Sequence, residues 1–124
     1  MTFRESLPTE CPPADAEEIV APKVVYRLVR NEPPGLSDFD SQRALKPNAT
    51  FGVSECIARG LSVHTQLADS IRTAKLPMLK GSKPCRVTLD DGAGYLQQTG
   101  TPSHHTWWPL AEFDILATCE AVET

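Results

Sequence analysis

The apolar segments of this chain are short, and proline and glycine separate them at irregular intervals. The 124 residues include 11 prolines and 7 glycines. Proline breaks helices and central strands, and glycine favours turns. We therefore expect several short strands, one good amphipathic helix and one or two lesser helices, without regular strand–helix alternation. This pattern predicts a single small α+β domain with a mainly antiparallel or mixed sheet.

The clearest strand covers residues 24–30, which are rich in β-branched and aromatic residues and are bounded by Pro22 and a Pro-Pro-Gly turn. Alternation along this strand places Val25, Arg27 and Val29 on one face. The Arg27 side chain therefore lies on the same face as two valines, and we expect it to be half-buried. A buried arginine is normally paired, so Arg27 is either a structural residue or an anion-binding group.

The clearest helix follows a short strand at residues 61–64. Apolar residues recur at helical spacing at Leu67, Ile71 and Ala74, Thr65 is a natural N-cap, and Pro77 ends the pattern. We expect a helix over about residues 65–76.

The remaining segments predict smaller elements. A hairpin is expected from strands at 85–89 and 95–99, and a short helix at 42–45 with Phe39 as a core anchor. Residues 109–112 are compatible with a helical turn, and residues 113–122 with either a strand or a helix. Proline and acidic residues dominate residues 1–22, which predicts a flexible or loosely docked arm before a domain at 23–124.

Charge and cysteine spacing exclude several classes of protein. The net charge of −4 argues against general nucleic-acid binding. No apolar run is long enough to cross a bilayer. Four widely spaced cysteines form no C-x-x-C pair, and no secretory leader pattern is present at the start. We expect a cytoplasmic protein with reduced, partly buried thiols.

Residues 102–109 contain two of the three histidines and both tryptophans. On an extended chain His105 shares a face with Trp107, and His104 shares the other with Thr106 and Trp108. One face should be core and the other more exposed. Either the tryptophans are core anchors with hydrogen-bonded histidines beside them, or one histidine serves as a general acid or base in a tryptophan-lined cleft.

Metal and hydrolase chemistry are not indicated. His64, His104 and His105 could supply three nitrogens to zinc only if the fold gathers them, and adjacent histidines on a strand point apart. No G-x-S-x-G motif surrounds Ser62. We therefore expect no metal site.

The order of several motifs resembles known families. Tyr26-Arg27 is followed by Pro33-Pro34, Asp38-Phe39, a Gly-Leu-Ser-Val segment at 60–63 and the terminal 103–109 segment. This order resembles a family of small bacterial proteins, some of them from mobile or toxin–antitoxin contexts, over residues 24–120. The layout is also distantly similar to ADP-ribosyltransferases. That resemblance implies that Arg27 helps to hold NAD and that the Ser62 strand leads into a helix under the nicotinamide pocket.

The family's catalytic glutamate has no counterpart, because the Gln97-Gln98-Thr99 segment lacks the acid. The sequence therefore predicts a cleft for an anionic or nucleotide-like ligand, with NAD as a possible cofactor and the enzymatic activity left open. The cleft residues would be Tyr26, Arg27, Ser62, His104, His105, Trp107 and Trp108. The alternative is a non-enzymatic antitoxin, immunity or adaptor component that contacts a protein partner, or a second copy of itself, through exposed aromatic residues.

Overall fold

The computed structural model describes residues 2–122 and is an α+β domain, as predicted. The strands are β1 (Glu17–Glu18), β2 (Lys23–Val29), β3 (Leu61–His64), β4 (Lys83–Leu89), β5 (Gly94–Gln98), β6 (His104–Pro109) and β7 (Cys119–Ala121). The helices are α1 (Gln42–Leu45), α2 (Glu55–Ala58) and α3 (Leu67–Ala74). Short 3₁₀ turns cover Leu36–Phe39, Pro77–Leu79 and Leu116–Thr118.

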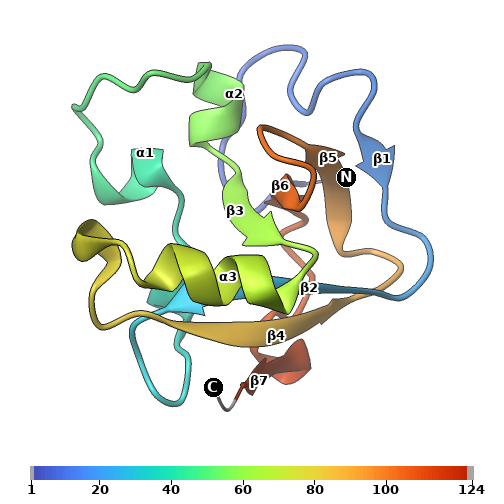
Figure 1. Ribbon diagram of the computed structural model, residues 1–124. Helices are drawn as coiled ribbons and strands as arrows, with labels where there is room; N and C mark the ends of the chain where they lie inside the picture. The colour runs from blue at the N-terminus through green and yellow to red at the C-terminus, as the bar shows by residue number, and fades with distance from the viewer. Residues whose placement is uncertain (1, 123–124) are drawn as a thin grey trace.

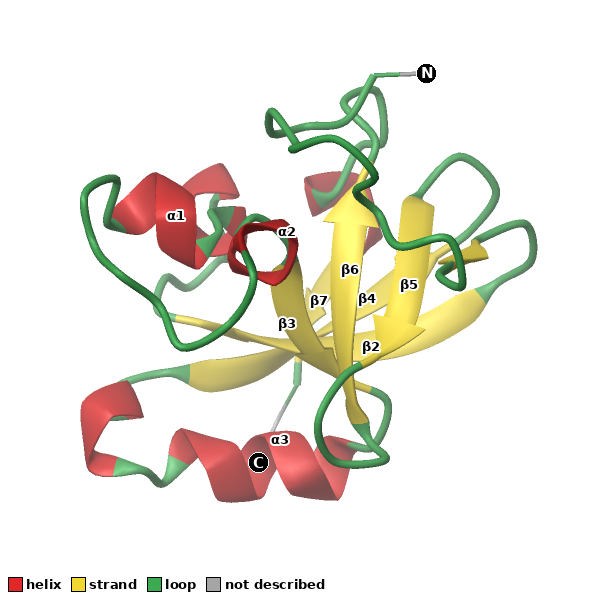
Figure 2. Cartoon of the chain, turned by 90° about the horizontal axis from the view of Figure 1, so that it is seen from above, coloured by secondary structure: helices red, strands yellow, loops and turns green. Residues whose placement is uncertain are grey.

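All strand pairs are antiparallel, in the order β1-β5-β6-β3-β2-β4-β7. Strands β2 and β3 pair at one position, where Tyr26 lies opposite His64. By contrast, β2 pairs with β4 along its whole length, and β3 with β6. The sheet therefore has two halves joined at a single residue pair, and Figure 2 shows β5, β6 and β3 crossing β2 and β4 steeply.

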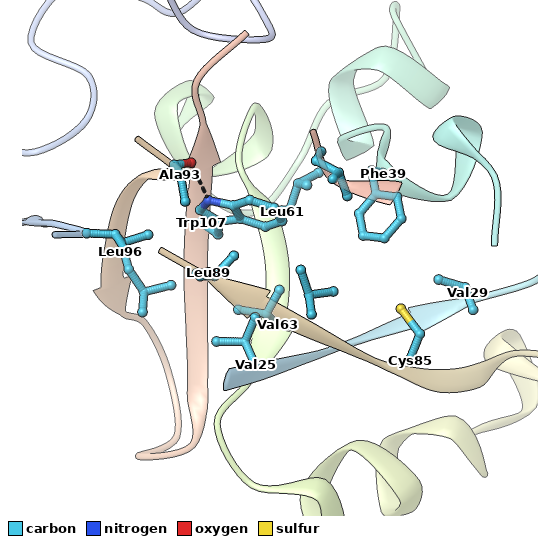
Figure 3. Close-up of a cluster of buried hydrophobic side chains, with 13 residues drawn as sticks. Val25, Val29, Phe39, Leu61, Val63, Cys85, Leu89, Ala93, Leu96 and Trp107 are labelled. Carbon is cyan, nitrogen blue, oxygen red and sulfur yellow. Dashed lines mark hydrogen bonds between the residues drawn. The ribbon is translucent and has the colours of Figure 1, made fainter. Parts of the chain in front are cut away.

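The hydrophobic core lies between the two halves (Figure 3). Val25 and Leu89 come from β2 and β4, while Val63 and Trp107 come from β3 and β6, and all four are fully buried. Phe39, the expected anchor, is also fully buried and confirms that prediction. Its 3₁₀ turn precedes α1, whose N-cap is Ser41.

Helix α3 covers the outer side of β2 and β4 (Figures 1 and 2). It is shorter than the predicted 65–76 and begins two residues later, at Leu67, because Gln66 rather than Thr65 takes the N-cap position. The Gln66 side chain makes no capping hydrogen bond. The start of α3 thus keeps first-turn N–H groups without a capping side chain.

The N-terminal residues, expected to form a flexible or loosely docked arm, lie against the domain. Glu17 and Glu18 pair with β5, and Ile19 is buried in the core. Glu5 accepts hydrogen bonds from the Ser41 N–H at 3.0 Å and from the Ser41 hydroxyl at 2.5 Å. These contacts arise from long-range pairing, which the local proline and acid content does not reveal.

The expectation of four reduced thiols is wrong for one pair of cysteines. Cys11 and Cys56 form a disulfide that joins the N-terminal residues to α2. Cys85 and Cys119 are free, with Cys85 buried and Cys119 half-buried. The sequence separation of 45 between Cys11 and Cys56 explains why sequence spacing gave no signal for this bond.

Residues 113–122, for which both a strand and a helix were considered, do not form one continuous element of either kind. It contains a 3₁₀ turn at Leu116–Thr118 and then β7 at Cys119–Ala121. Residues 109–112 do not form the helical turn considered for them, since Pro109 ends β6 and a turn follows. Among the described residues, no helix is long and apolar enough to cross a membrane.

Candidate functional site

Arg27 is held by backbone carbonyl groups. Its guanidinium donates to the carbonyl oxygens of Asp38 at 3.2 Å, Asp40 at 3.2 Å and Ser62 at 2.9 Å. Burial lowers the pKa of Arg27 to about 10, which still leaves it protonated at neutral pH. These bonds fasten the segment between Asp38 and Asp40 to the sheet, so most of the donor capacity of Arg27 serves the fold.

Tyr26 and Ser62 lie on neighbouring strands but do not converge with Arg27 on a cavity. The Tyr26 ring has the Arg86 guanidinium 5.9 Å from its centroid. Ser62 is exposed, and its contact with Arg27 runs through its backbone carbonyl rather than its hydroxyl. The strand that carries Arg27 is next to the strand that carries Ser62, and α3 follows the Ser62 strand.

Both tryptophans are buried, which corrects the expectation that one face of β6 would be more exposed. Trp107 and Trp108 are 0% and 1% exposed. The Trp107 indole N–H donates to the Ala93 carbonyl at 3.0 Å (Figure 3), and that of Trp108 donates to the Cys56 carbonyl at 2.9 Å. Helix α2 lies against the second face of β6, so neither indole lines an open cleft.

His104 and His105 point to opposite faces of β6 and are half-buried. Nδ1 of His104 lies 2.6 Å from the Thr99 carbonyl, and Nδ1 of His105 lies 3.1 Å from the Ser103 carbonyl. A carbonyl oxygen only accepts, so both Nδ1 atoms carry a proton in these bonds. Each imidazole is therefore oriented by the backbone through Nδ1.

His64 is not among the cleft residues predicted from the sequence, where it was considered only as a zinc ligand. It is 9% exposed, and no side-chain hydrogen bond to it is found among the described residues. Its ring lies edge-on to His104, with 5.5 Å between centroids. Burial first, and then the proximity of His104, lower the pKa of His64, while Asp69 acts in the opposite direction. His64 is therefore a buried imidazole, mainly neutral at neutral pH, without a fixed partner.

His64 lines a cavity of about 530 Å³ between the end of β3, the start of α3 and the turn before β6. Ser103 closes one side, where its hydroxyl accepts from the Gln66 N–H at 3.1 Å. Asp69 and Arg72 lie on α3 and form a salt bridge of 2.7 Å, so their charges offset one another. This cavity combines a free imidazole, the start of a helix and an exposed guanidinium.

A second cavity, of about 730 Å³, lies near the other end of β2 and β4 and is lined in part by Arg30 and Lys83. The Arg30 guanidinium is bonded to the carbonyls of Met78 and Lys80. None of the predicted site residues lines this cavity.

The structure thus separates the predicted cleft residues. Arg27, Trp107 and Trp108 are structural, whereas the histidine end of the sheet borders a cavity through His64. The sequence signal that could have identified His64 is its position as the last residue of the predicted strand at 61–64, directly before the predicted helix; that Gln66 rather than Thr65 is the N-cap is known only from the structure.

Among the described residues, no three histidine, cysteine or carboxylate side chains gather as a metal-ligand set. No protein-family model matches the chain, and neither does any curated protein or solved structure.

Proposed function

We propose that the chain binds a small anionic ligand, such as a phosphate group, in the cavity beside His64. One observation carries the proposal: His64 is nine-tenths buried, has no described hydrogen-bond partner and borders that cavity. Among the described residues the one fully buried polar side-chain atom without a partner is Ser70 Oγ, so the ring nitrogens of His64 are accessible from the cavity and a ligand can bond to them in place of water. An anion would accept a hydrogen bond from the imidazole and would favour its protonated form.

The start of α3 supports an anion rather than a cation. Free N–H groups and the helix dipole give the first turn of a helix a partial positive charge. The Gln66 side chain does not cap these groups. Asp69 lies in this first turn, but its salt bridge with Arg72 offsets the negative charge. An incoming anion would therefore meet His64 and the positive end of the α3 dipole, beside an Asp69–Arg72 pair whose charges offset one another.

The resemblance to ADP-ribosyltransferases suggests the class of ligand. Ser62 lies on β3, which leads into α3, and the His64 cavity lies at this connection, whereas Arg27 does not line it. A nucleotide such as NAD carries the phosphate groups that the His64 cavity would accept. The missing glutamate gives no basis for transferase chemistry, so binding is proposed and turnover is not.

A partner protein anchored by exposed aromatic residues finds no support in the described part of the chain, where the exposed large hydrophobic residues are all aliphatic or methionine. The disulfide also bears on the compartment. A cytoplasmic location was expected from the sequence, but the Cys11–Cys56 disulfide favours an oxidising compartment, where such bonds persist.

Sulfate is a suitable first probe, because its charge stays constant across the range in which histidine titrates. Sulfate affinity, measured by NMR titration, should increase as the pH falls from about 8 to about 5.5, since protonated imidazole is the better partner. In His64→Leu the affinity at the lower pH should fall about tenfold, which corresponds to one lost charge-assisted hydrogen bond.

His105→Leu is the matched control. His105 does not border the cavity, and the Ser103 carbonyl that it contacts also accepts from the Thr65 N–H at 2.9 Å. This variant should bind sulfate as the wild type does. Equal affinity for sulfate in wild type and His64→Leu would reject the anion site. Sulfate binding without any NAD or ADP binding at millimolar concentration would retain the anion site and reject the nucleotide class.

A further inference from the structure

The two free cysteines lie in contact on neighbouring strands. Cys85 is on β4 and Cys119 is the first residue of β7. Their sulfur atoms are 3.1 Å apart, and the Cys119 thiol is oriented as a donor toward the Cys85 sulfur. A spacing of 34 residues separates them in the sequence, so the β4–β7 pairing brings them together.

The strand register places both side chains on the same face of the sheet. Cys85 pairs with Ala121 and Cys119 pairs with Val87, which makes the two cysteines diagonal neighbours. Residues two apart on a strand share a face, so Cys85, Val87 and Cys119 all point toward the core. Cys119 packs on the core cluster that contains Cys85. The two sulfur atoms can therefore meet without any change in the pairing of β4 with β7.

We propose that Cys85 and Cys119 are a second disulfide-forming pair, which closes by exchange with a low-molecular-weight disulfide and fastens β7 to β4. A disulfide requires about 2.05 Å between sulfur atoms, so closure needs a movement of about 1 Å from the observed contact. The edge position of β7 makes such a movement possible, because this three-residue strand pairs on one side through β4.

The exchange would begin at Cys119, which is half-buried, whereas Cys85 is fully buried. The Cys119 thiolate attacks oxidised glutathione, forming a mixed disulfide and releasing one glutathione thiolate. The Cys85 thiolate then attacks the Cys119 sulfur and releases the second glutathione. The two protein thiols lose two protons and two electrons, and oxidised glutathione becomes two reduced molecules.

Thiol burial controls the rate of this exchange. Burial raises the pKa of Cys85 far above its ordinary value and also raises the pKa of Cys119. Thiolate is the attacking species, so exchange should be slow at neutral pH and faster at higher pH. The pair is therefore expected to behave as a structural disulfide once closed and not as a rapid redox catalyst.

Mass spectrometry after alkylation tests the pair. Wild-type protein would be reduced, refolded in a glutathione redox buffer, denatured and treated with iodoacetamide. We expect no alkylated cysteine, and a peptide map with Cys85 joined to Cys119 and Cys11 joined to Cys56. Alkylation of Cys85 and Cys119 in protein that retains the Cys11–Cys56 bond would overturn the proposal. A peptide that joins either residue to Cys11 or Cys56 would also overturn it.

Two serine variants provide matched controls. Cys119→Ser should leave Cys85 as a single alkylated thiol, and Cys85→Ser should leave Cys119, while the Cys11–Cys56 bond forms in both. Oxidised wild type should unfold at a higher denaturant concentration than Cys119→Ser, and reduction of Cys85–Cys119 should abolish that difference. Equal unfolding midpoints for oxidised wild type and Cys119→Ser would contradict the fastening of β7. The result is independent of sulfate binding at His64.

Discussion

Arg27 and His64 lie close together at the joint between the two half-sheets, yet their hydrogen bonding differs completely. Arg27 is next to Tyr26, which is the residue opposite His64. The arginine donates to three backbone carbonyls, whereas the histidine has no hydrogen-bond partner among the described residues. A side chain whose donors are bound to the backbone serves the fold. A buried side chain without partners retains the capacity to bind a ligand.

The largest expected effect tests whether the tryptophan region is structural. Trp107→Ala should lower the free energy of unfolding by roughly 3–5 kcal/mol, because it leaves a large cavity and removes one of the two N–H donors to the Ala93 carbonyl, which keeps the bond from the Leu110 N–H. Chemical denaturation would measure this loss. Trp107→Phe should retain more of the packing against Phe113 and should lose less stability. If Trp107→Ala left the free energy of unfolding nearly unchanged, the region would be less tightly packed than described.

A smaller effect is expected at Arg27. Arg27→Ala should lower the free energy of unfolding by about 2–3 kcal/mol, because carbonyls that accepted from a charged group lose that donor. Arg27→Lys should recover only part of this loss, because an ammonium group lacks the planar arrangement of donors. Sulfate affinity of the folded Arg27→Lys protein should match that of the wild type. A large change in that affinity would mean that Arg27 contributes to the ligand site after all.

The smallest effect is the pH dependence that His64 gives to stability. The pKa of folded His64 is below its ordinary value, so above the unfolded-state pKa both states are neutral and stability is complete. As the pH falls from there through the folded-state pKa, the unfolded chain takes up the proton first and stability is lost. His64→Leu should lose less stability over this acidic range than the wild type, as measured by urea denaturation. The neighbouring residues His104, His105 and Asp69 remain in both proteins, so their influence is common to the two curves. If the free energy of unfolding changed with pH in the same way in both proteins, the lowered pKa of His64 would be refuted.

Much of the fold could be predicted from local patterns. Alternation in the Tyr26 strand and helical spacing from Leu67 to Ala74 both reflect burial of one face, and both elements are present. The predicted burial of Phe39 is also confirmed. These features depend on a few neighbouring residues, so a sequence reading can identify them.

The site could not be predicted in the same way, because it depends on contacts between distant segments. Alternation correctly separates Trp107 from Trp108, but it does not reveal that α2 and the N-terminal residues cover the second face. The Arg27 partners Asp38 and Ser62 are likewise distant from it in the sequence. Local sequence patterns therefore identify residues whose side chains could bind a ligand. Contacts between distant segments determine which of those side chains are already hydrogen-bonded or buried within the fold.

The bond between Cys11 and Cys56 has a consequence for the integrity of the chain. It encloses exposed loop residues, including Lys46 and Asn48, at which a protease could cut. A single cut there would leave two fragments covalently attached to each other. Such a nicked molecule should migrate as one species until a reductant separates the fragments, so one broken peptide bond need not release any part of the protein.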